Sequence, residues 1–150
     1  MSATDLFEED LLDLIFTNVA APNVGDGPGL LPSATAGSFY ISLHTGTLLD
    51  THTSQQQTEA AYGSYARQAV ARSTAGWTVT TDGTGLVDND SAITFPQASS
   101  GSETETDFGI GSASSGVGNL QIFGALTSSL AVSTNITPEF AAGALDITLA

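Results

Sequence analysis

The stretch SFYISLH at residues 38–44 decides the predicted fold class. Its apolar residues Phe39, Ile41 and Leu43 alternate with more polar neighbours, and this period of two places them on one face of a β-strand. Similar short runs follow at residues 65–71, 77–80, 93–95, 108–110, 120–123, 130–132 and 145–149. Turns rich in glycine, serine and aspartate separate these runs. The pattern predicts a mainly β protein, either an antiparallel β-sandwich or a jelly roll.

Residues 55–72 fit this pattern least well. The run Glu59-Ala60-Ala61 and the alanines of residues 66–71 would also support a short helix. We interpret residues 65–71 as a strand, with a helix as the alternative.

The segment before residue 38 predicts one N-terminal α-helix within residues 1–20. Its apolar side chains recur at three- and four-residue spacing between acids, at Phe7, Leu11, Leu12, Leu14, Ile15 and Phe16. Ser2 or Thr4 is expected to cap the first turn, and the proline- and glycine-rich residues 22–29 should end the helix. The apolar face is expected to cover an open end of the domain, and the alternative is docking on a neighbouring subunit.

The length of 150 residues suits a single domain, with the helix in residues 1–20 and the β-sandwich in residues 38–150. Sixteen acidic residues face only Arg67 and Arg72, which gives a net charge of −14 with no lysine. Two arginines cannot supply the phosphate contacts that nucleic-acid binding requires. An anionic membrane is disfavoured for the same reason, and no apolar run approaches the length of a spanning helix. The acidic N-terminus does not resemble a signal peptide, so we expect synthesis in a cytoplasm.

Catalytic chemistry has little support in the sequence. His44 and His52 lie outside any metal-binding motif, and neither a G-x-S-x-G elbow nor an S-x-x-K motif occurs. We therefore predict no enzyme activity, no catalytic residues, no cofactor and no metal ion. Glu103, Glu105 and Asp107 would share a face in an extended segment, but their serine- and threonine-rich setting indicates a solvated linker.

Two further clusters have a functional and an ordinary interpretation. Asp82, Asp88, Asn89 and Asp90 supply oxygen ligands of the kind that calcium prefers, although turn chemistry explains the same residues and is favoured. Four aromatic residues would offer stacking surfaces to a carbohydrate or receptor, but we favour burial in the core, above all for Trp77. They are Tyr40, Tyr62, Tyr65 and Trp77.

The two arginines are five positions apart, which would place them on opposite faces of a regular strand. They are therefore not expected to form one site. Each is expected to have a carboxylate partner, within the domain or across an interface, and we hypothesise that at least one anchors a subunit contact. The candidate interface residues are Arg67, Arg72, Phe7, Leu11 and Ile15.

Several motifs closely resemble small tailed-phage virion structural proteins, and they occur in the same order along nearly the whole chain. They are FYISLHT at 39–45, YGSYAR at 62–67, VARS at 70–73, AGWTV at 75–79, AITFP at 92–96, DFGIG at 107–111, GNL at 118–120, GALT at 124–127 and ITPEFAAGAL at 136–145. Such proteins are often labelled tail fibre proteins, and similar acidic β-proteins serve as capsid decoration or cement subunits. The resemblance implies a virion location and no catalytic residues.

We therefore expect a structural virion protein, and we favour a capsid decoration subunit over a tail or tail-fibre component. A fibre usually has an elongated repeat or a coiled-coil shaft, and the sequence shows neither. The expected partners are the major capsid protein or other virion proteins, with further copies of the chain in a homo-oligomer. A carbohydrate- or receptor-binding module is the alternative from another class.

Overall fold

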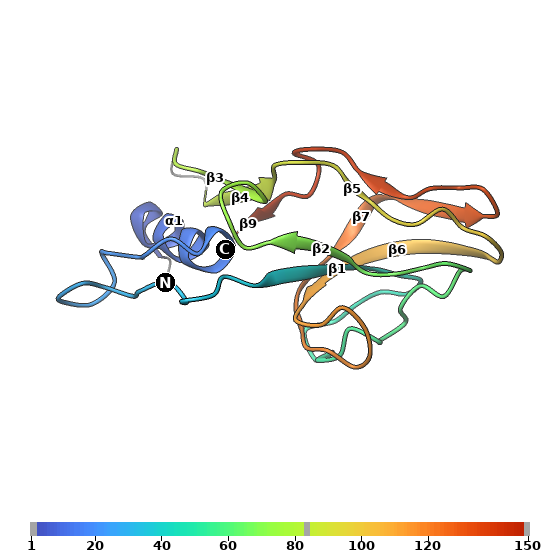
Figure 1. Cartoon of the computed structure of the whole chain (residues 1–150), viewed down its shortest axis with the longest axis horizontal. Helices are drawn as coiled ribbons and strands as arrows, with labels where there is room; N and C mark the ends of the chain where they lie inside the picture. Colours follow the sequence, from blue (N-terminus) through green and yellow to red (C-terminus); the bar gives the residue numbers. More distant parts are fainter. Residues whose placement is uncertain (1–2, 83–84, 149–150) are drawn as a thin grey trace. The chain divides into compact units, whose positions relative to one another are not determined.

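The computed structural model describes residues 3–82 and 85–148 (Figure 1). It is mainly β with antiparallel sheets and one N-terminal helix, as predicted. The elements in chain order are α1 (Asp5–Leu12), the π-helical turn η1 (Asp13–Thr17), β1 (Ser38–His44), β2 (Gln68–Ala71), β3 (Trp77–Thr80), β4 (Leu86–Asn89), β5 (Ile93–Thr94), β6 (Ser102–Gly111), β7 (Leu120–Ser133), β8 (Glu139–Phe140) and β9 (Ile147–Thr148).

Two compact units are formed from segments that are not contiguous in the sequence. Unit 1 comprises Met1–Gly37, Ala71–Ile93 and Phe140–Ala150, and unit 2 comprises Ser38–Val70 and Thr94–Glu139. The chain passes repeatedly from one unit to the other. The single domain expected from the length stays a prediction.

Unit 2 is built on a sheet with the strand order β2-β1-β6-β7, in which Ile41 of β1 lies opposite Ile110 of β6. Figure 1 shows β1 and β6 side by side. The alternating residues Phe39, Ile41 and Leu43 are buried, as the period of two predicts. The intervening Ser42 and His44 are buried as well. On this second face the His44 ring lies against the segment near residue 57, where Nδ1 is 2.7 Å from the Gln57 carbonyl.

Unit 1 combines the helical segment with the antiparallel sheet β3-β4-β9. α1 contacts β3 and β4, and η1 contacts β3. Leu12 and Phe16 are almost fully buried, and the Phe16 ring meets the Trp77 ring edge-on with the centroids 4.9 Å apart. The helix therefore covers the sheet of this unit through its second half.

The helical segment ends at Asn18, as the sequence predicted. Asn18 adopts the left-handed conformation with φ of 57°, which closes a helix because its N–H can turn back to a carbonyl of the last turn. Its side-chain amide exchanges two hydrogen bonds with the backbone of Ser33, at 3.0 and 2.9 Å. At the other end Thr4 occupies the N-cap position without a side-chain cap bond, so that part of the prediction is wrong. Ser2 lies outside the described residues.

The strand predictions are confirmed for β1 and β3, and the expected strands at residues 120–123 and 130–132 are one strand, β7. The solvated linker predicted around Glu103 is wrong, because β6 already begins at Ser102. The segment alternates glutamate with β-branched threonine, and that period of two outweighs its polar composition.

The structure differs from the sequence-based predictions in three smaller ways. Residues 86–89 form β4, where a turn was predicted. Of the doubtful residues 65–71, the strand covers Gln68–Ala71, and no helix occurs in residues 55–72. Glu139–Phe140 form the short strand β8, which pairs with β5 and was not predicted.

Candidate functional site

Arg67 is the centre of a buried polar cluster in unit 2. Its side chain is 2% exposed, and its Nε and Nη2 donate to the two carboxylate oxygens of Glu59 at 2.6 and 2.7 Å. Nη1 donates to Gln55 Oε1 at 3.3 Å and to the Ala113 carbonyl at 2.9 Å, and Nη2 also donates to the Gly116 carbonyl at 2.7 Å. These bonds use every N–H donor of a guanidinium. Arg67 therefore joins three segments of unit 2 to one another.

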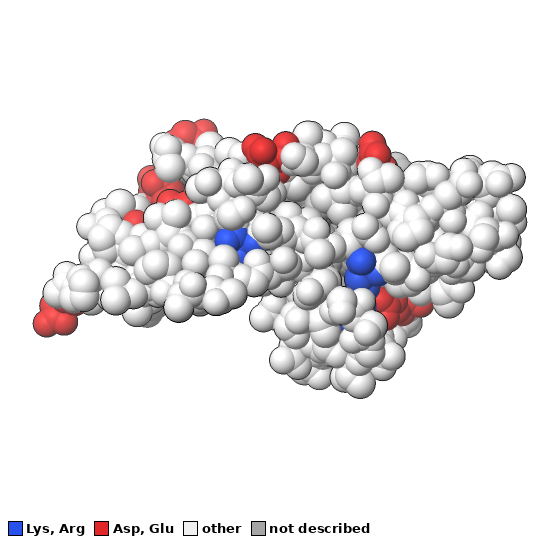
Figure 2. Space-filling model, in the orientation of Figure 1, with Lys and Arg blue, Asp and Glu red and all other residues white. Residues whose placement is uncertain are grey.

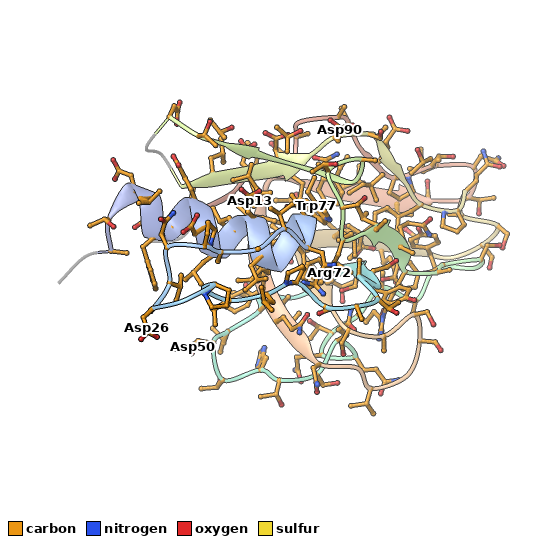
Figure 3. All side chains as sticks on the ribbon, turned by 60° about the vertical axis from the view of Figure 1, so that its left-hand side comes forward. Asp13, Asp26, Asp50, Arg72, Trp77 and Asp90 are labelled. Carbon is orange, nitrogen blue, oxygen red and sulfur yellow. The ribbon has the colours of Figure 1, made fainter. Side chains whose placement is uncertain are left out.

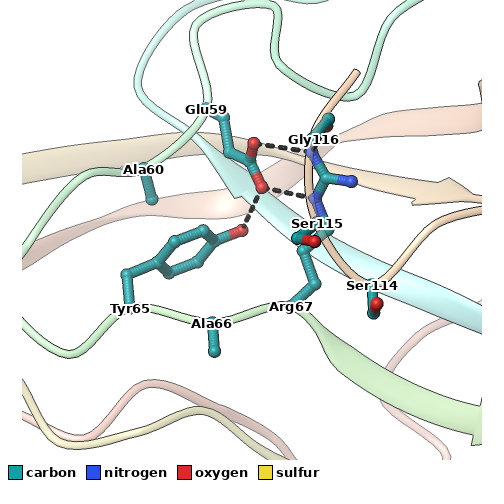
Figure 4. A pocket seen from close by; sticks show the side chains of 8 residues that line it. All are labelled: Glu59, Ala60, Tyr65, Ala66, Arg67, Ser114, Ser115 and Gly116. Carbon is teal, nitrogen blue, oxygen red and sulfur yellow. Dashed lines mark hydrogen bonds and ion pairs between the residues drawn. The ribbon is translucent and has the colours of Figure 1, made fainter. Parts of the chain in front are cut away.

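A pocket of about 240 Å³ opens beside this ion pair (Figure 4). It is lined by Glu59, Ala60, Tyr65, Ala66, Arg67, Ser114, Ser115 and Gly116. The Tyr65 hydroxyl donates to Glu59 Oε1 at 3.1 Å and accepts from the Leu43 N–H at 3.1 Å. Burial, and next the negative charge of Glu59, raise the pKa of Tyr65 well above its usual range, so the phenol stays protonated. The pocket thus combines an ion pair whose charges neutralise each other with a protonated phenol and the side chains of Ser114 and Ser115.

His44 and Ser42 place an imidazole Nε2 within 2.8 Å of a serine hydroxyl, the pairing that many hydrolases use. Both residues are 0% exposed, however, and His44 Nδ1 lies 2.7 Å from the Gln57 carbonyl instead of a carboxylate. Because a carbonyl can only accept, Nδ1 carries the proton and Nε2 accepts from the serine. Burial lowers the pKa of His44, which keeps the ring neutral. A Cβ at Gly109 would lie 2.7 Å from Nε2, so glycine is required for this close approach.

The acids of β6, predicted to be solvated, are partly built into the interior. Glu103 Oε1 accepts from the N–H groups of Ala61 and Tyr62 at 2.9 and 2.8 Å. Asp107 is 4% exposed, and its Oδ2 accepts from the Leu48 N–H at 3.1 Å. Both carboxylates therefore hold loop backbone against the sheet.

Glu105 differs from these two acids. It is 0% exposed, its carboxyl oxygens have no hydrogen-bond partner of good geometry among the described residues, and the Glu103 carboxyl lies close enough to interact with it. Burial, reinforced by the charge of Glu103, raises the pKa of Glu105 to about 8, so the group is mostly neutral at pH 7. Burial likewise raises the pKa of Tyr62 to about 12, and its hydroxyl also has no partner among the described residues.

Arg72 belongs to unit 1 and binds the end of the helical segment (Figure 3). Its Nε donates to the Ile15 carbonyl at 2.6 Å, Nη2 to the Leu14 carbonyl at 2.8 Å, and Nη1 to the Ala36 carbonyl at 2.9 Å. A positive charge at a helix C-terminus interacts favourably with the helix dipole. The expected carboxylate partner is present for Arg67, whereas these three bonds of Arg72 go to carbonyls. The two arginines have separate sets of partners, as expected.

The interface residues predicted on the helix differ in exposure. Phe7 is 41% exposed, while Leu11 and Ile15 are half-buried. Among the described residues, five of the eight large apolar side chains that are exposed lie in the N-terminal segment of unit 1, namely Leu6, Phe7, Val19, Leu30 and Leu31. The exposed residues of the loop after the helix were not anticipated, because periodicity says nothing about irregular segments.

The candidate calcium residues do not converge on a cation. Asn89 is fully buried in β4, and its side-chain oxygen accepts from the N–H groups of Ala144 and Leu145 at 3.2 and 2.9 Å. Asp90 Oδ1 accepts from the Thr78 hydroxyl at 3.1 Å. Residues 83–84, in the middle of this predicted loop, lie outside the described residues. Across residues 3–82 and 85–148, no group of three histidine or acidic side chains is placed to hold a metal ion.

The aromatic side chains are mostly in the core. Trp77 is 1% exposed and Tyr62 is 3% exposed, so neither presents a face to a ligand, and the core interpretation is confirmed for both. Tyr40 and Tyr65 are half-buried. In unit 2 the Tyr65 ring stacks on Phe95 with centroids 6.2 Å apart. No helix in the described part of the chain is long and apolar enough to span a membrane.

The internal polar groups of this β-protein hold its loops against its sheets. Residues 2–148 match the family described as Podophage GP4 fiber I protein gp80. The chain belongs to this family. Membership in a podophage fibre protein family confirms the predicted resemblance to tailed-phage virion proteins and makes the chain a structural virion protein. No curated protein matches the chain.

Proposed function

We propose that the chain is a structural subunit of the podophage fibre and acts through protein–protein contacts without catalysis. The observation that carries the proposal is the family match over residues 2–148, which spans both compact units. The sequence favoured a capsid decoration subunit on the ground that a shaft is missing. The family description favours the fibre instead, where a compact module can serve without forming a shaft of its own.

The hydrogen bonds inside the two units support a structural role for the protein. Arg67 and Arg72 donate to groups of their own units, and the pair formed by Ser42 and His44 is inaccessible. Side chains with catalytic potential are therefore used to hold strands and loops in place. The Arg67 guanidinium, whose N–H donors are all used, belongs to the kind of satisfied buried network that makes a core rigid.

The contact surface that we propose is the exposed apolar part of the N-terminal segment. Phe7, the most exposed of the predicted interface residues, lies next to Leu6, which is 55% exposed, and Leu31 is 66% exposed. Exposed apolar side chains that gather on one surface are typical of protein interaction sites, and we propose such a surface within residues 6–31. The partner is another virion protein, since the chain is a component of the virion. Arg72 contributes indirectly, because it holds the end of the helical segment that presents this surface.

Localisation in the particle tests the proposal. Gold-labelled antibodies against the subunit, viewed by electron microscopy on intact phage, are expected to mark the fibres. Labelling of the capsid shell would overturn the fibre assignment and favour a decoration subunit.

Variants at the apolar surface test the contact itself. Phe7→Ser is expected to lower incorporation of the subunit into particles without altering the unfolding of the isolated protein. Leu49→Ser is the matched control, because Leu49 is 51% exposed and belongs to unit 2. Equal incorporation of both variants would contradict the proposed contact.

A further inference from the structure

Acidic side chains flank the exposed apolar residues of α1. Leu6 and Phe7 are 55% and 41% exposed. Residues three and four positions apart are neighbours on a helix, so Glu9 and Asp10 lie beside Leu6, and Asp10 also lies beside Phe7. Asp5, which is exposed, directly precedes Leu6. Any partner that covers the two apolar side chains must therefore approach a strongly negative helix.

The negative charge of unit 1 is not neutralised within the unit. Ten of the sixteen acids belong to it, and Arg72 is its one arginine. Burial, and next the charges of Asp146 and Asp90, raise the pKa of Asp88, as expected where acids lie near one another. Figure 2 shows acidic side chains in the part of the view where Figure 1 draws α1. The ten acids are Asp5, Glu8, Glu9, Asp10, Asp13, Asp26, Asp82, Asp88, Asp90 and Asp146.

A second copy of this chain does not supply the opposite charge. The sequence contains no lysine, and its two arginines are bonded inside their own units. The Arg67 side chain is 2% exposed, and three N–H groups of Arg72 donate to carbonyls around the end of the helical segment. Two chains of net charge −14 that met through α1 would repel each other. Nucleic acid and anionic membrane are disfavoured by the same charge.

We propose that α1 docks into an apolar pocket with a basic rim, lysine included, on a different virion protein. This inference rests on the proposed function and names the chemistry of the partner for the same surface. Leu6 and Phe7 enter the pocket, while Asp5 and Glu9 face the cations of the rim. Protein interfaces commonly combine an apolar centre with a polar rim. The opposite charges on the rim raise the association rate and reject acidic partners.

The absence of lysine from this chain makes carboxyl–lysine crosslinking a direct test. A carbodiimide joins a carboxyl group to an amine that lies in contact with it, so a crosslink from this chain to a lysine must end on a different protein. In intact purified particles, peptide mass spectrometry is expected to find residues 5–10 joined to lysines of another virion protein. Crosslinks that come only from acids of unit 2, or no crosslink from residues 5–10, would overturn the proposal.

Neutral variants test whether these charges matter for assembly. Asp5→Asn combined with Glu9→Gln is expected to lower incorporation roughly fivefold when variant and wild-type subunits compete for the same particles, since two rim pairs are lost. Asp50→Asn combined with Glu139→Gln is the matched control, because it removes the same charge from unit 2 and should be incorporated like the wild type. Equal incorporation of the two double variants would contradict the basic rim. Thermal unfolding of the isolated variants shows whether each is folded, and the crosslinking of wild-type particles stays decisive if one is not.

The failure of this inference can be told apart from the failure of the proposed function. If Phe7→Ser lowers incorporation but residues 5–10 form no crosslink to lysine, the apolar contact stands and the basic rim is wrong. If gold labelling marks the capsid, the fibre assignment is wrong, and the crosslinked lysines still identify a basic partner.

Discussion

Arg67 holds three segments of unit 2 through one guanidinium, and its removal would leave Glu59 as a carboxylate without its cation in a nearly buried place. Breaking one partner out of a buried ion pair costs roughly 3–5 kcal/mol of unfolding free energy. We expect Arg67→Ala to destabilise the protein by about this amount, measured by urea unfolding. Arg67→Lys keeps the charge but cannot reproduce the fork of bonds, so it should recover a minor part of the loss. A loss below about 1 kcal/mol for Arg67→Ala would show that the cluster contributes little.

Glu105 makes the stability depend on pH. In the unfolded chain this carboxyl titrates near its ordinary value of 4.5, whereas in the fold it keeps its proton up to about pH 8. Its contribution is therefore complete below about pH 4.5 and is lost as the pH rises through 8. Glu105→Gln imitates the neutral form. We expect the variant to match the wild type near pH 4 and to exceed its unfolding free energy by roughly 2–4 kcal/mol at pH 9.

Denaturant unfolding across this pH range measures the effect. The exposed substitution Asp50→Asn serves as the control and should shift the curve of stability against pH little (Figure 3). A difference between Glu105→Gln and the wild type that stays constant from pH 4 to pH 9 would be inconsistent with a buried neutral carboxyl.

At the scale of elements, the N-terminal helical segment divides into two functional halves. Phe16 is 1% exposed against Trp77, whereas Phe7 is 41% exposed. Phe16→Ala should cost about 3–5 kcal/mol through the cavity it leaves. Phe7→Ala should change the unfolding free energy by no more than about 0.5 kcal/mol. Thermal unfolding of both variants measures these changes. Equal losses of unfolding free energy would mean that the helix is buried along its whole length.

The sequence predicts where the helix and strands lie better than it predicts which of their residues other segments cover. Period-two alternation located β1 and β3, and three-to-four spacing located the helix, because both signals come from the backbone geometry of one segment. Which part of the helix is covered depends on β3 and β4, which contact it across a long separation in sequence. Residue type could not show that Glu105 is buried. Its burial depends on the loop near Tyr62 that covers β6.

The buried polar cluster around Arg67 shows the same limit of prediction from sequence. Scarcity of cations predicted a carboxylate partner for Arg67, and Glu59 is that partner. Gln55, which accepts from Arg67 and from the Ala113 N–H, had no signal of its own, since it lies in a segment without regular periodicity. Loop residues that serve as partners are brought together by tertiary structure, so a local pattern does not reveal them.

At the scale of the whole molecule, the chain crosses between the two compact units several times, so neither unit is a continuous segment. Breaking one unit would release the ends of chain segments that the other unit must hold. We therefore expect both units to unfold in one cooperative transition, as the single-domain prediction requires.

Two side chains report on the unfolding of the two units separately. Trp77, the one tryptophan in the sequence, reports on unit 1, and the buried imidazole of His44 reports on unit 2. Tryptophan fluorescence and histidine NMR signals followed through the same urea titration should give coincident midpoints. Midpoints that differ beyond error would show two domains that fold separately.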